Sequence, residues 1–255
     1  MIHNIRTLQL ASLCMASLCV TSAASAQSVC LPLPRLLTTM PMGGTVGTQV
    51  EIMITGENIE DAGELLFTHP GLTASPKQDA NGQPEANKYI VTIAADCPTG
   101  VHEARLMSRL GISSARVFCV DTLPEVTQTA PNTTLATAME LKVNSICNAV
   151  MTIKAVDHYW FDAIKGHRYI VNCASRGIDS KLDAVLIIGD SAGRDLVVER
   201  RGGTLDFTAP EDGRHVIKVH ELTFKGGPAF YYRLALQELA ADAGIPEFAS
   251  TKTVN

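Results

Sequence analysis

Residues 153–171 read Ile-Lys-Ala-Val-Asp-His-Tyr-Trp-Phe-Asp-Ala-Ile-Lys-Gly-His-Arg-Tyr-Ile-Val. Tyr159 and Phe161 alternate with more polar neighbours, Lys165-Gly166 marks a turn, and the alternation resumes from Tyr169. A period of two, interrupted by Gly and Asp turns and without a helical period, is typical of short antiparallel strands. The stretch therefore predicts a sandwich of antiparallel sheets.

The same pattern continues to Leu236. Further strands are expected at residues 148–153, 184–188, 196–200, 205–208, 215–220 and 230–236. Eight or so strands at this spacing fit a jelly roll. We place this second β-sandwich domain at residues 138–238, followed by a polar tail at 239–255.

The first half of the chain also alternates. Val50, Ile52 and Ile54 are spaced by polar residues, and strands are expected at 65–67, 89–93, 104–106 and 117–120. This pattern predicts an immunoglobulin-like sandwich over residues 33–121. A polar segment with two prolines, residues 74–87, is expected to be a loop. Residues 122–137, rich in Pro and Thr, are interpreted as a linker, so the fold class is all-β with two sandwich domains.

The chain begins with a secretory signal. A weakly basic start, an apolar run and Ala24-Ser25-Ala26 predict a signal peptide at residues 1–26. No later apolar run approaches the length of a membrane span. The formal net charge is −5 and there is no basic tract, which argues against a nucleic-acid partner. The expected location is therefore secreted, periplasmic or at the cell surface.

Five cysteines follow the predicted cleavage site, namely Cys30, Cys97, Cys119, Cys147 and Cys173. Export permits disulfides, and an odd count leaves one thiol over. Cys97 with Cys119 is the preferred bridge and Cys147 with Cys173 the second choice. The alternative, that these cysteines are small buried apolar residues, stays open.

Both halves resemble known families. Residues 41–59, 65–72 and 111–120 resemble the IPT/TIG type of immunoglobulin-like domain. Residues 132–238 resemble the bacterial pre-peptidase C-terminal domain; the motifs that carry this resemblance are Asp157-His-Tyr-Trp-Phe161, Ser180-Lys-Leu-Asp-Ala184, Asp190-Ser-Ala-Gly193, Pro210-Glu-Asp-Gly213, Gly226-Gly227 and Tyr232-Arg-Leu234. The order of the two is similar to that in exported proteins of planctomycete-type bacteria.

The resemblance implies a non-catalytic domain that binds a polymer or assists a secreted peptidase. Some relatives bind calcium and collagen. Here Arg200 and Arg201 stand where an acidic turn would supply oxygen ligands, and two positive charges oppose a calcium site. We therefore assign no cofactor and no metal-binding residue, with calcium as the open alternative.

One motif suggests catalysis. Gly189-Asp-Ser-Ala-Gly193 matches the Gly-x-Ser-x-Gly elbow of esterases, with Ser191 as the nucleophile. Such an elbow opens a helix, whereas Arg194 to Glu199 has the pattern of a strand. We interpret the motif as a hairpin turn, and assign no catalytic residue; an esterase that uses Ser191 is kept as a third hypothesis.

Other polar and aromatic groups have structural explanations. The histidines are not at metal-binding spacing, and His215 and His220 should face opposite sides of one strand; the four considered are His158, His167, His215 and His220. The acids that flank turns are Asp157, Asp162, Asp179 and Asp183. Core packing is favoured over a binding platform for Tyr159, Trp160, Tyr231 and Tyr232.

These observations predict an exported, non-enzymatic binding or adhesion module whose ligand is a polysaccharide or a protein polymer. The alternative is an accessory or inhibitory partner of a secreted peptidase. The ligand itself and the oligomeric state do not follow from the sequence.

Overall fold

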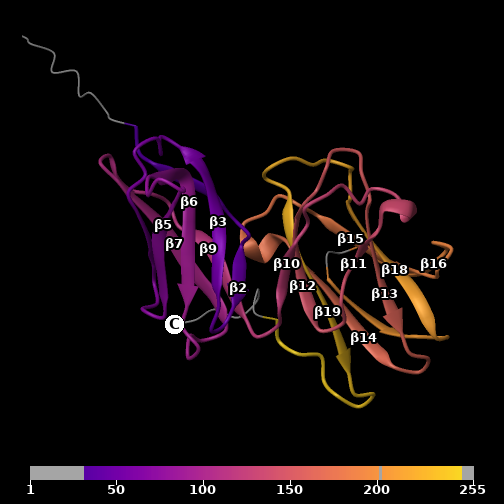
Figure 1. The fold of residues 1–255 in the computed structure, drawn as a ribbon. Helices are drawn as coiled ribbons and strands as arrows, with labels where there is room; N and C mark the ends of the chain where they lie inside the picture. The colour runs from indigo at the N-terminus through magenta and orange to yellow at the C-terminus, as the bar shows by residue number, and fades with distance from the viewer. Residues whose placement is uncertain (1–31, 201–202, 249–255) are drawn as a thin grey trace, which may run out of the picture. The chain divides into compact units, whose positions relative to one another are not determined.

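The structure is a computed structural model that describes residues 32–200 and 203–248. Its residues from Leu33 onward belong to one compact unit. This part of the chain is built almost wholly of β-strands, with two single-turn 3-10 helices (Figure 1). The predicted signal peptide lies outside the described residues. No helix within them is long and apolar enough to cross a membrane.

The first two sheets form the N-terminal sandwich. Sheet A contains, in spatial order, β1 (Arg35–Met40), β3 (Gln49–Glu57), β6 (Pro84–Ile93) and β5 (Leu72–Gln78). Sheet B contains β2 (Gly43–Thr45), β9 (Arg116–Asp121), β7 (Gly100–Ser108) and β4 (Glu64–Phe67), and β8 (Gly111–Ile112) pairs with β7. This is the strand order of an immunoglobulin sandwich, as predicted.

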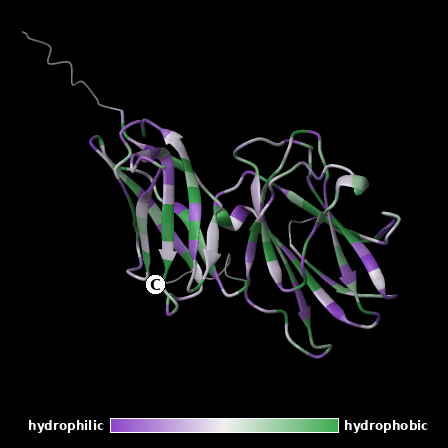
Figure 2. Ribbon diagram, viewed as in Figure 1, coloured by the Kyte–Doolittle hydropathy of each residue, from purple (hydrophilic) through white to green (hydrophobic). Residues whose placement is uncertain are grey.

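The core of the N-terminal sandwich follows from the alternation along its strands. Ile52 and Ile54 of sheet A pack in one apolar cluster with Leu106 and Phe118 of sheet B. The residues that alternate with them, Glu51, Met53 and Thr55, are exposed on the outer face, and Figure 2 shows the alternation as green and purple bands along the strands. The period of two therefore places one face of each sheet in the core.

The expectation of a loop at residues 74–87 is wrong. Most of this segment belongs to β5 and to the beginning of β6, which pair antiparallel. β5 lies at the edge of sheet A and has a register shift between Pro76 and Gln78. An edge strand tolerates a proline because no ladder hydrogen bond is lost on its free side. The turn between the two strands is short. The Asp79 carboxylate stabilises it by accepting hydrogen bonds from the amides of Asn81 and Gln83.

The C-terminal sandwich has two sheets of five strands. Sheet C contains β10 (Glu125–Thr127), β12 (Ser145–Val150), β19 (Tyr231–Leu239), β14 (Arg168–Ala174) and β17 (Thr204–Thr208). Sheet D contains β11 (Met139–Glu140), β13 (Asp157–Ala163), β18 (Gly213–Glu221), β15 (Ala184–Gly189) and β16 (Asp195–Glu199). Most successive strands from β12 to β19 cross to the opposite sheet, which is the jelly-roll arrangement that the sequence predicts.

The segment predicted as a linker takes part in the C-terminal sandwich. β10 pairs parallel with β12, and a 3-10 helix, η1 (Leu135–Thr137), precedes β11. A three-residue strand carries too little periodicity to be recognised from sequence. The boundaries of the two domains stay a prediction.

The predicted disulfides are absent, because the four cysteines of the described residues are all free and buried. Phe118 and Val120 point into the core that contains Cys97, so Cys119 between them points to the other face. Cys147 and Cys173 both stand opposite Leu234, on the two sides of β19. Two strand spacings put their Cα atoms about 9.6 Å apart, whereas a disulfide requires about 4.4–6.8 Å. Burial raises the pKa of the Cys119 and Cys147 thiols to about 11, so they stay protonated at neutral pH.

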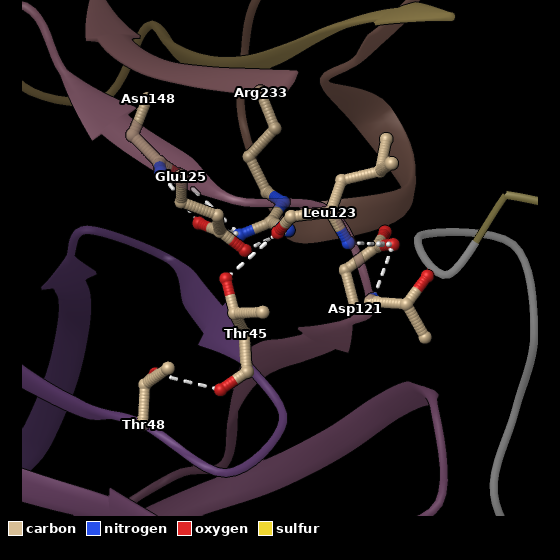
Figure 3. Close-up of polar contacts among 8 residues, drawn as sticks. Thr45, Thr48, Asp121, Leu123, Glu125, Asn148 and Arg233 are labelled. Atoms are coloured by element: carbon tan, nitrogen blue, oxygen red, sulfur yellow. Dashed lines mark hydrogen bonds and ion pairs between the residues drawn. The ribbon is translucent and has the colours of Figure 1, made fainter. Parts of the chain in front are cut away.

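A buried ion pair lies beside the segment that joins the two sandwiches (Figure 3). The Arg233 guanidinium of β19 donates to both carboxylate oxygens of Glu125 on β10, at 2.7 and 2.9 Å. Asn148 donates to the same carboxylate at 2.7 Å. A Cβ placed on Gly43 of β2 would lie 2.0 Å from the guanidinium, so that strand approaches it closely. An apolar cluster that includes Met42 and Tyr231 also links residues of the two sandwiches.

Candidate functional site

The Gly-x-Ser-x-Gly motif forms a hairpin turn between β15 and β16. The Asp190 carboxylate accepts hydrogen bonds from the amides of Ala192 and Arg194 and from the Arg194 side chain. The Gly193 amide closes the turn on the Asp190 carbonyl at 2.9 Å. A strand rather than a helix follows, so Ser191 does not stand on a nucleophile elbow.

The four histidines lie in separate surroundings. His215 is buried in the core against Phe161 and Phe207, and its Nε2 atom has no hydrogen-bond partner among the residues that the structure describes. His220, on the same strand, points outward, as predicted for residues five apart. His158 Nδ1 lies 2.8 Å from the Val156 carbonyl. Among the described residues, no three His, Cys, Asp or Glu side chains are grouped so as to hold a metal ion.

His167 lines an open cleft of about 550 Å³ at one end of β14 and β19. Its charged groups are already engaged. His167 Nδ1 lies 2.6 Å from Glu238 Oε1, and the Arg168 side chain binds both carboxylate oxygens of Asp206 at 2.6 and 2.8 Å. Within the part of the chain that the structure describes, no Phe, Tyr or Trp side chain lines this cleft. This cleft is therefore a weaker candidate for a functional site than the two loops described below.

The three tyrosines and three of the four Asp side chains, those of Asp157, Asp179 and Asp183, have structural roles within the fold. Tyr159, Tyr231 and Tyr232 are buried, which confirms core packing rather than a platform. Asp183 pairs with Arg176, and Asp179 accepts a hydrogen bond from the Val117 amide at 3.1 Å. Asp162 is exposed on the outer side of β13. Trp160 is partly exposed, but the Arg214 guanidinium lies 3.8 Å from the centre of its ring and covers it.

The strongest candidate site consists of two loops at one end of the C-terminal sandwich, which we call the loop platform (residues 152–155 and 222–227). The first loop joins β12 to β13 and the second follows β18; Figure 1 shows both at the same end of the sandwich. The Lys154 amide donates to the Phe224 carbonyl at 3.0 Å, and the Gly227 amide donates to the Met151 carbonyl at 2.8 Å. The two loops therefore hold one another in place.

Phe224 has a left-handed backbone, with φ of 59°. Such a conformation is unfavourable for a bulky residue, and it persists only where the surrounding structure enforces it. Lys154, its hydrogen-bonding partner in the other loop, is also left-handed, with φ of 60°. Strain of this kind concentrates at binding sites, and it marks the loop platform as a candidate.

The platform exposes apolar side chains. Ile153 is 61 % exposed, Leu222 50 % and Phe224 45 %. The Phe224 ring stacks on the His220 ring, with centroids 4.7 Å apart and planes 3° from parallel. The imidazole thus supports the phenyl ring from one side. An exposed, supported aromatic ring beside two aliphatic side chains is typical of a surface that binds a ligand.

Glu221, buried at the end of β18, fixes the shape of the second loop. One of its carboxylate oxygens accepts hydrogen bonds from the Thr223 amide, the Thr223 hydroxyl and the Lys225 amide, at 2.6, 2.8 and 2.9 Å. Burial favours the neutral acid, but these hydrogen bonds favour the carboxylate more strongly and lower the pKa of Glu221. The loop is therefore ordered before any ligand arrives.

This arrangement predicts how the loop responds to pH. Because the pKa of Glu221 is lower in the folded protein, its contribution to stability is complete above the ordinary carboxyl pKa of about 4.3 and is lost as the pH falls below that value. The amide proton resonance of Thr223, followed by NMR, should shift with a midpoint below about 4.3. The transition should be missing in Glu221→Gln. A midpoint at or above the ordinary value would contradict the proposed role of this carboxylate.

A polar cleft of about 200 Å³ adjoins the platform through Thr152. Its other lining residues are Gln128, Thr129, Ala130, Pro131, Thr133 and Asp157. Asp157 is buried and accepts a hydrogen bond from the Tyr232 hydroxyl at 2.6 Å. Burial raises the pKa of this carboxyl, and the hydrogen bond from Tyr232 opposes the effect. The platform is thus bordered by hydrogen-bonding groups as well as by apolar ones.

The sequence interpretation missed Phe224 entirely. One signal was present, since Phe224-Lys-Gly-Gly227 places an aromatic residue in a glycine-rich turn directly after a strand. An aromatic side chain in such a turn has no strand face on which to be buried. The stacking on His220 and the contact with residues 152–155 depend on the tertiary structure.

No protein-family model matches the chain, and no curated protein matches it. Among solved structures, a periplasmic inhibitor of g-type lysozyme from Aeromonas hydrophila is 14 % identical, with a TM-score of 0.33 over 40 % of this chain and 97 % of that one. The pre-peptidase C-terminal domain of a Bacillus anthracis collagenase is 11 % identical, with a TM-score of 0.32 over 39 % of this chain and 93 % of that one. A Bacteroides ovatus SGBP-B protein from a mixed-linkage glucan utilization locus, in complex with a heptasaccharide, is 13 % identical, with a TM-score of 0.27 over 77 % of this chain and 42 % of that one. Similarity at this level supports no conclusion about the fold or function of this chain.

Proposed function

We propose that this protein is an exported, non-catalytic binding module that holds a polysaccharide or a protein polymer on its loop platform, at the cell surface or in the periplasm. Export follows from the predicted signal peptide. The absence of catalysis is supported by the hairpin turn at Ser191, which does not present that hydroxyl as an elbow would. The observation that carries the proposal is Phe224, an exposed aromatic residue in a strained, preordered loop.

The geometry suits a polymer. Binding energy concentrates in a few aromatic anchors, and an anchor that is already ordered loses little conformational entropy on binding. The face of an aromatic ring is negatively polarised and attracts C–H groups of a ligand. Ile153 and Leu222 extend the apolar contact, and the cleft beside Thr152 offers hydrogen bonds.

The proposal predicts a large effect of Phe224→Ala. Loss of a central aromatic anchor costs about 2 kcal/mol or more, which is a fall in affinity of about 30-fold. The measurement is retention of purified protein on insoluble cellulose, chitin, peptidoglycan and collagen, with the bound fraction determined over a range of polymer concentrations. The wild-type protein should be retained on at least one of them.

Val198→Ala is the matched control, because Val198 is 42 % exposed on β16 and lies outside the platform. It should bind as the wild-type protein does. Equal retention of Phe224→Ala and wild type would remove the platform from the proposal. Failure of all four polymers, combined with recovery of a peptidase when the protein is purified under native conditions, would favour the peptidase-accessory alternative.

A further inference from the structure

We propose that the ligand of the loop platform is an anionic polysaccharide, held by Lys154, Lys181 and Lys225; this inference rests on the proposed binding function. All three lysines are exposed. Lys154 and Lys225 belong to the two loops of the platform itself. The Lys181 amide donates to the carbonyl of Ala229, two residues beyond the second loop, at 2.9 Å, which brings this lysine to the same region.

None of the three ammonium groups has a carboxylate within ion-pair distance among the described residues. The neighbouring acids have other hydrogen-bonding partners. Glu221 is buried under three hydrogen bonds, and its charge also interacts with Lys225 without forming an ion pair. Asp157 is buried and bonded to Tyr232, and Asp183 pairs with Arg176. Asp179 accepts from the Val117 amide. The ammonium groups of the platform, which form no ion pair, are therefore available to a ligand.

The three lysines form a local positive region on a protein that is acidic as a whole, with a formal net charge of −5. A chain with this balance repels polyanions except where its cations gather. Unpaired lysines around an apolar surface attract an anionic ligand and fix its position along the surface. They do so without covering the aromatic ring. A polysaccharide is favoured because it combines a regularly charged chain with the C–H faces that a ring such as Phe224 binds.

Two pairs of probes separate charge from backbone chemistry. Polygalacturonate and its methyl ester share one chain and differ in carboxylates, while dextran sulfate and dextran share another and differ in sulfate esters. Binding is measured by the retardation of native protein in gels that contain each soluble polymer, at low salt and at 0.5 M salt. We expect retardation by at least one charged member, none by its neutral counterpart, and loss of retardation at high salt.

The variant that tests the lysines is Lys154→Gln/Lys225→Gln. Its control is Lys142→Gln/Lys165→Gln, which makes the same change of charge in loops at the opposite ends of β12 and β13. Two exposed charge pairs together account for about fivefold in affinity. The platform variant should lose about that much, and the control variant should bind as the wild type does.

The results distinguish failure of the anionic ligand from failure of the platform as the binding site. Equal binding to the charged and neutral members of a pair, or equal losses in the two lysine variants, would overturn the anionic ligand while leaving the platform as the binding site. Retardation that persists in Phe224→Ala would overturn both. Binding to neither pair of polysaccharides, with retention on collagen, would leave the proposed function in place and reject the polysaccharide. A selective, salt-sensitive loss in Lys154→Gln/Lys225→Gln alone would establish it.

Discussion

Arg233→Met is expected to lower the free energy of unfolding by about 3–5 kcal/mol, because it leaves the Glu125 carboxylate buried without a countercharge. The side chains of Arg233 and Glu125 are only 4 % and 9 % exposed, so water cannot take the place of the lost partner. Asn148, which also binds this carboxylate, is buried as well and cannot supply a charge. The measurement is urea denaturation followed by circular dichroism.

Two further variants make this prediction specific. Arg105→Met removes one partner of the exposed pair between Arg105 and Glu103, and should cost no more than about 1 kcal/mol. Arg233→Met/Glu125→Met removes both buried charges and should recover at least half of the loss, because the penalty comes from the isolated carboxylate rather than from the missing attraction. A double variant no more stable than Arg233→Met would refute this explanation.

Phe161→Ala is expected to destabilise the protein by about 3–5 kcal/mol. Phe161 is 1 % exposed, and its ring makes an edge-to-face contact with Tyr169, at 5.3 Å between centroids. It also packs beside the His215 ring, which contacts the Phe207 ring as well, at 5.4 Å between centroids. A cavity at this position would be lined by rigid aromatic rings that cannot collapse into it. The loss of packing would therefore add to the loss of buried apolar surface.

Phe224→Ala provides the matched comparison, since it makes the same chemical change at an exposed site. It should alter the free energy of unfolding by less than about 0.5 kcal/mol, as surface substitutions do. The two substitutions would then differ in what they change: Phe161→Ala would lower the stability of the fold, and Phe224→Ala would lower the affinity for the ligand. A loss below about 1 kcal/mol in Phe161→Ala would contradict the assignment of this residue to the centre of the core.

Several features of the fold could be predicted because they are local. The alternation at Ile52 and Ile54, or at Tyr159 and Phe161, depends only on the two-residue repeat of a strand, and any sheet with one buried face must show it. The hairpin from Asp190 to Gly193 could be predicted for the same reason, since such a turn is stabilised by its own Asp side chain and backbone. The opposite orientation of His215 and His220 follows from the same repeat.

Other features could not be predicted from local pattern. β5 was expected to be a loop because Pro76 and polar neighbours are unfavourable in a central strand, and its position at the edge of sheet A removes the objection. The prediction of disulfides was wrong for a related reason. Cys147 and Cys173 lie in one predicted domain, but β19 lies between the two strands that carry them.

The amino-acid sequence by itself determined that the chain is all-β, that it forms two sandwiches, and that Ser191 lies in a hairpin turn. These properties depend on periodicity and turn chemistry, which act over a few residues. Only the tertiary structure decided that Phe224 stands exposed on His220, that residues 152–155 and 222–227 form one platform, and that Arg233 pairs with Glu125. The partners in these contacts are separated along the chain, apart from the ring stack, and their meeting depends on the order in which the strands pair, which local sequence patterns do not encode.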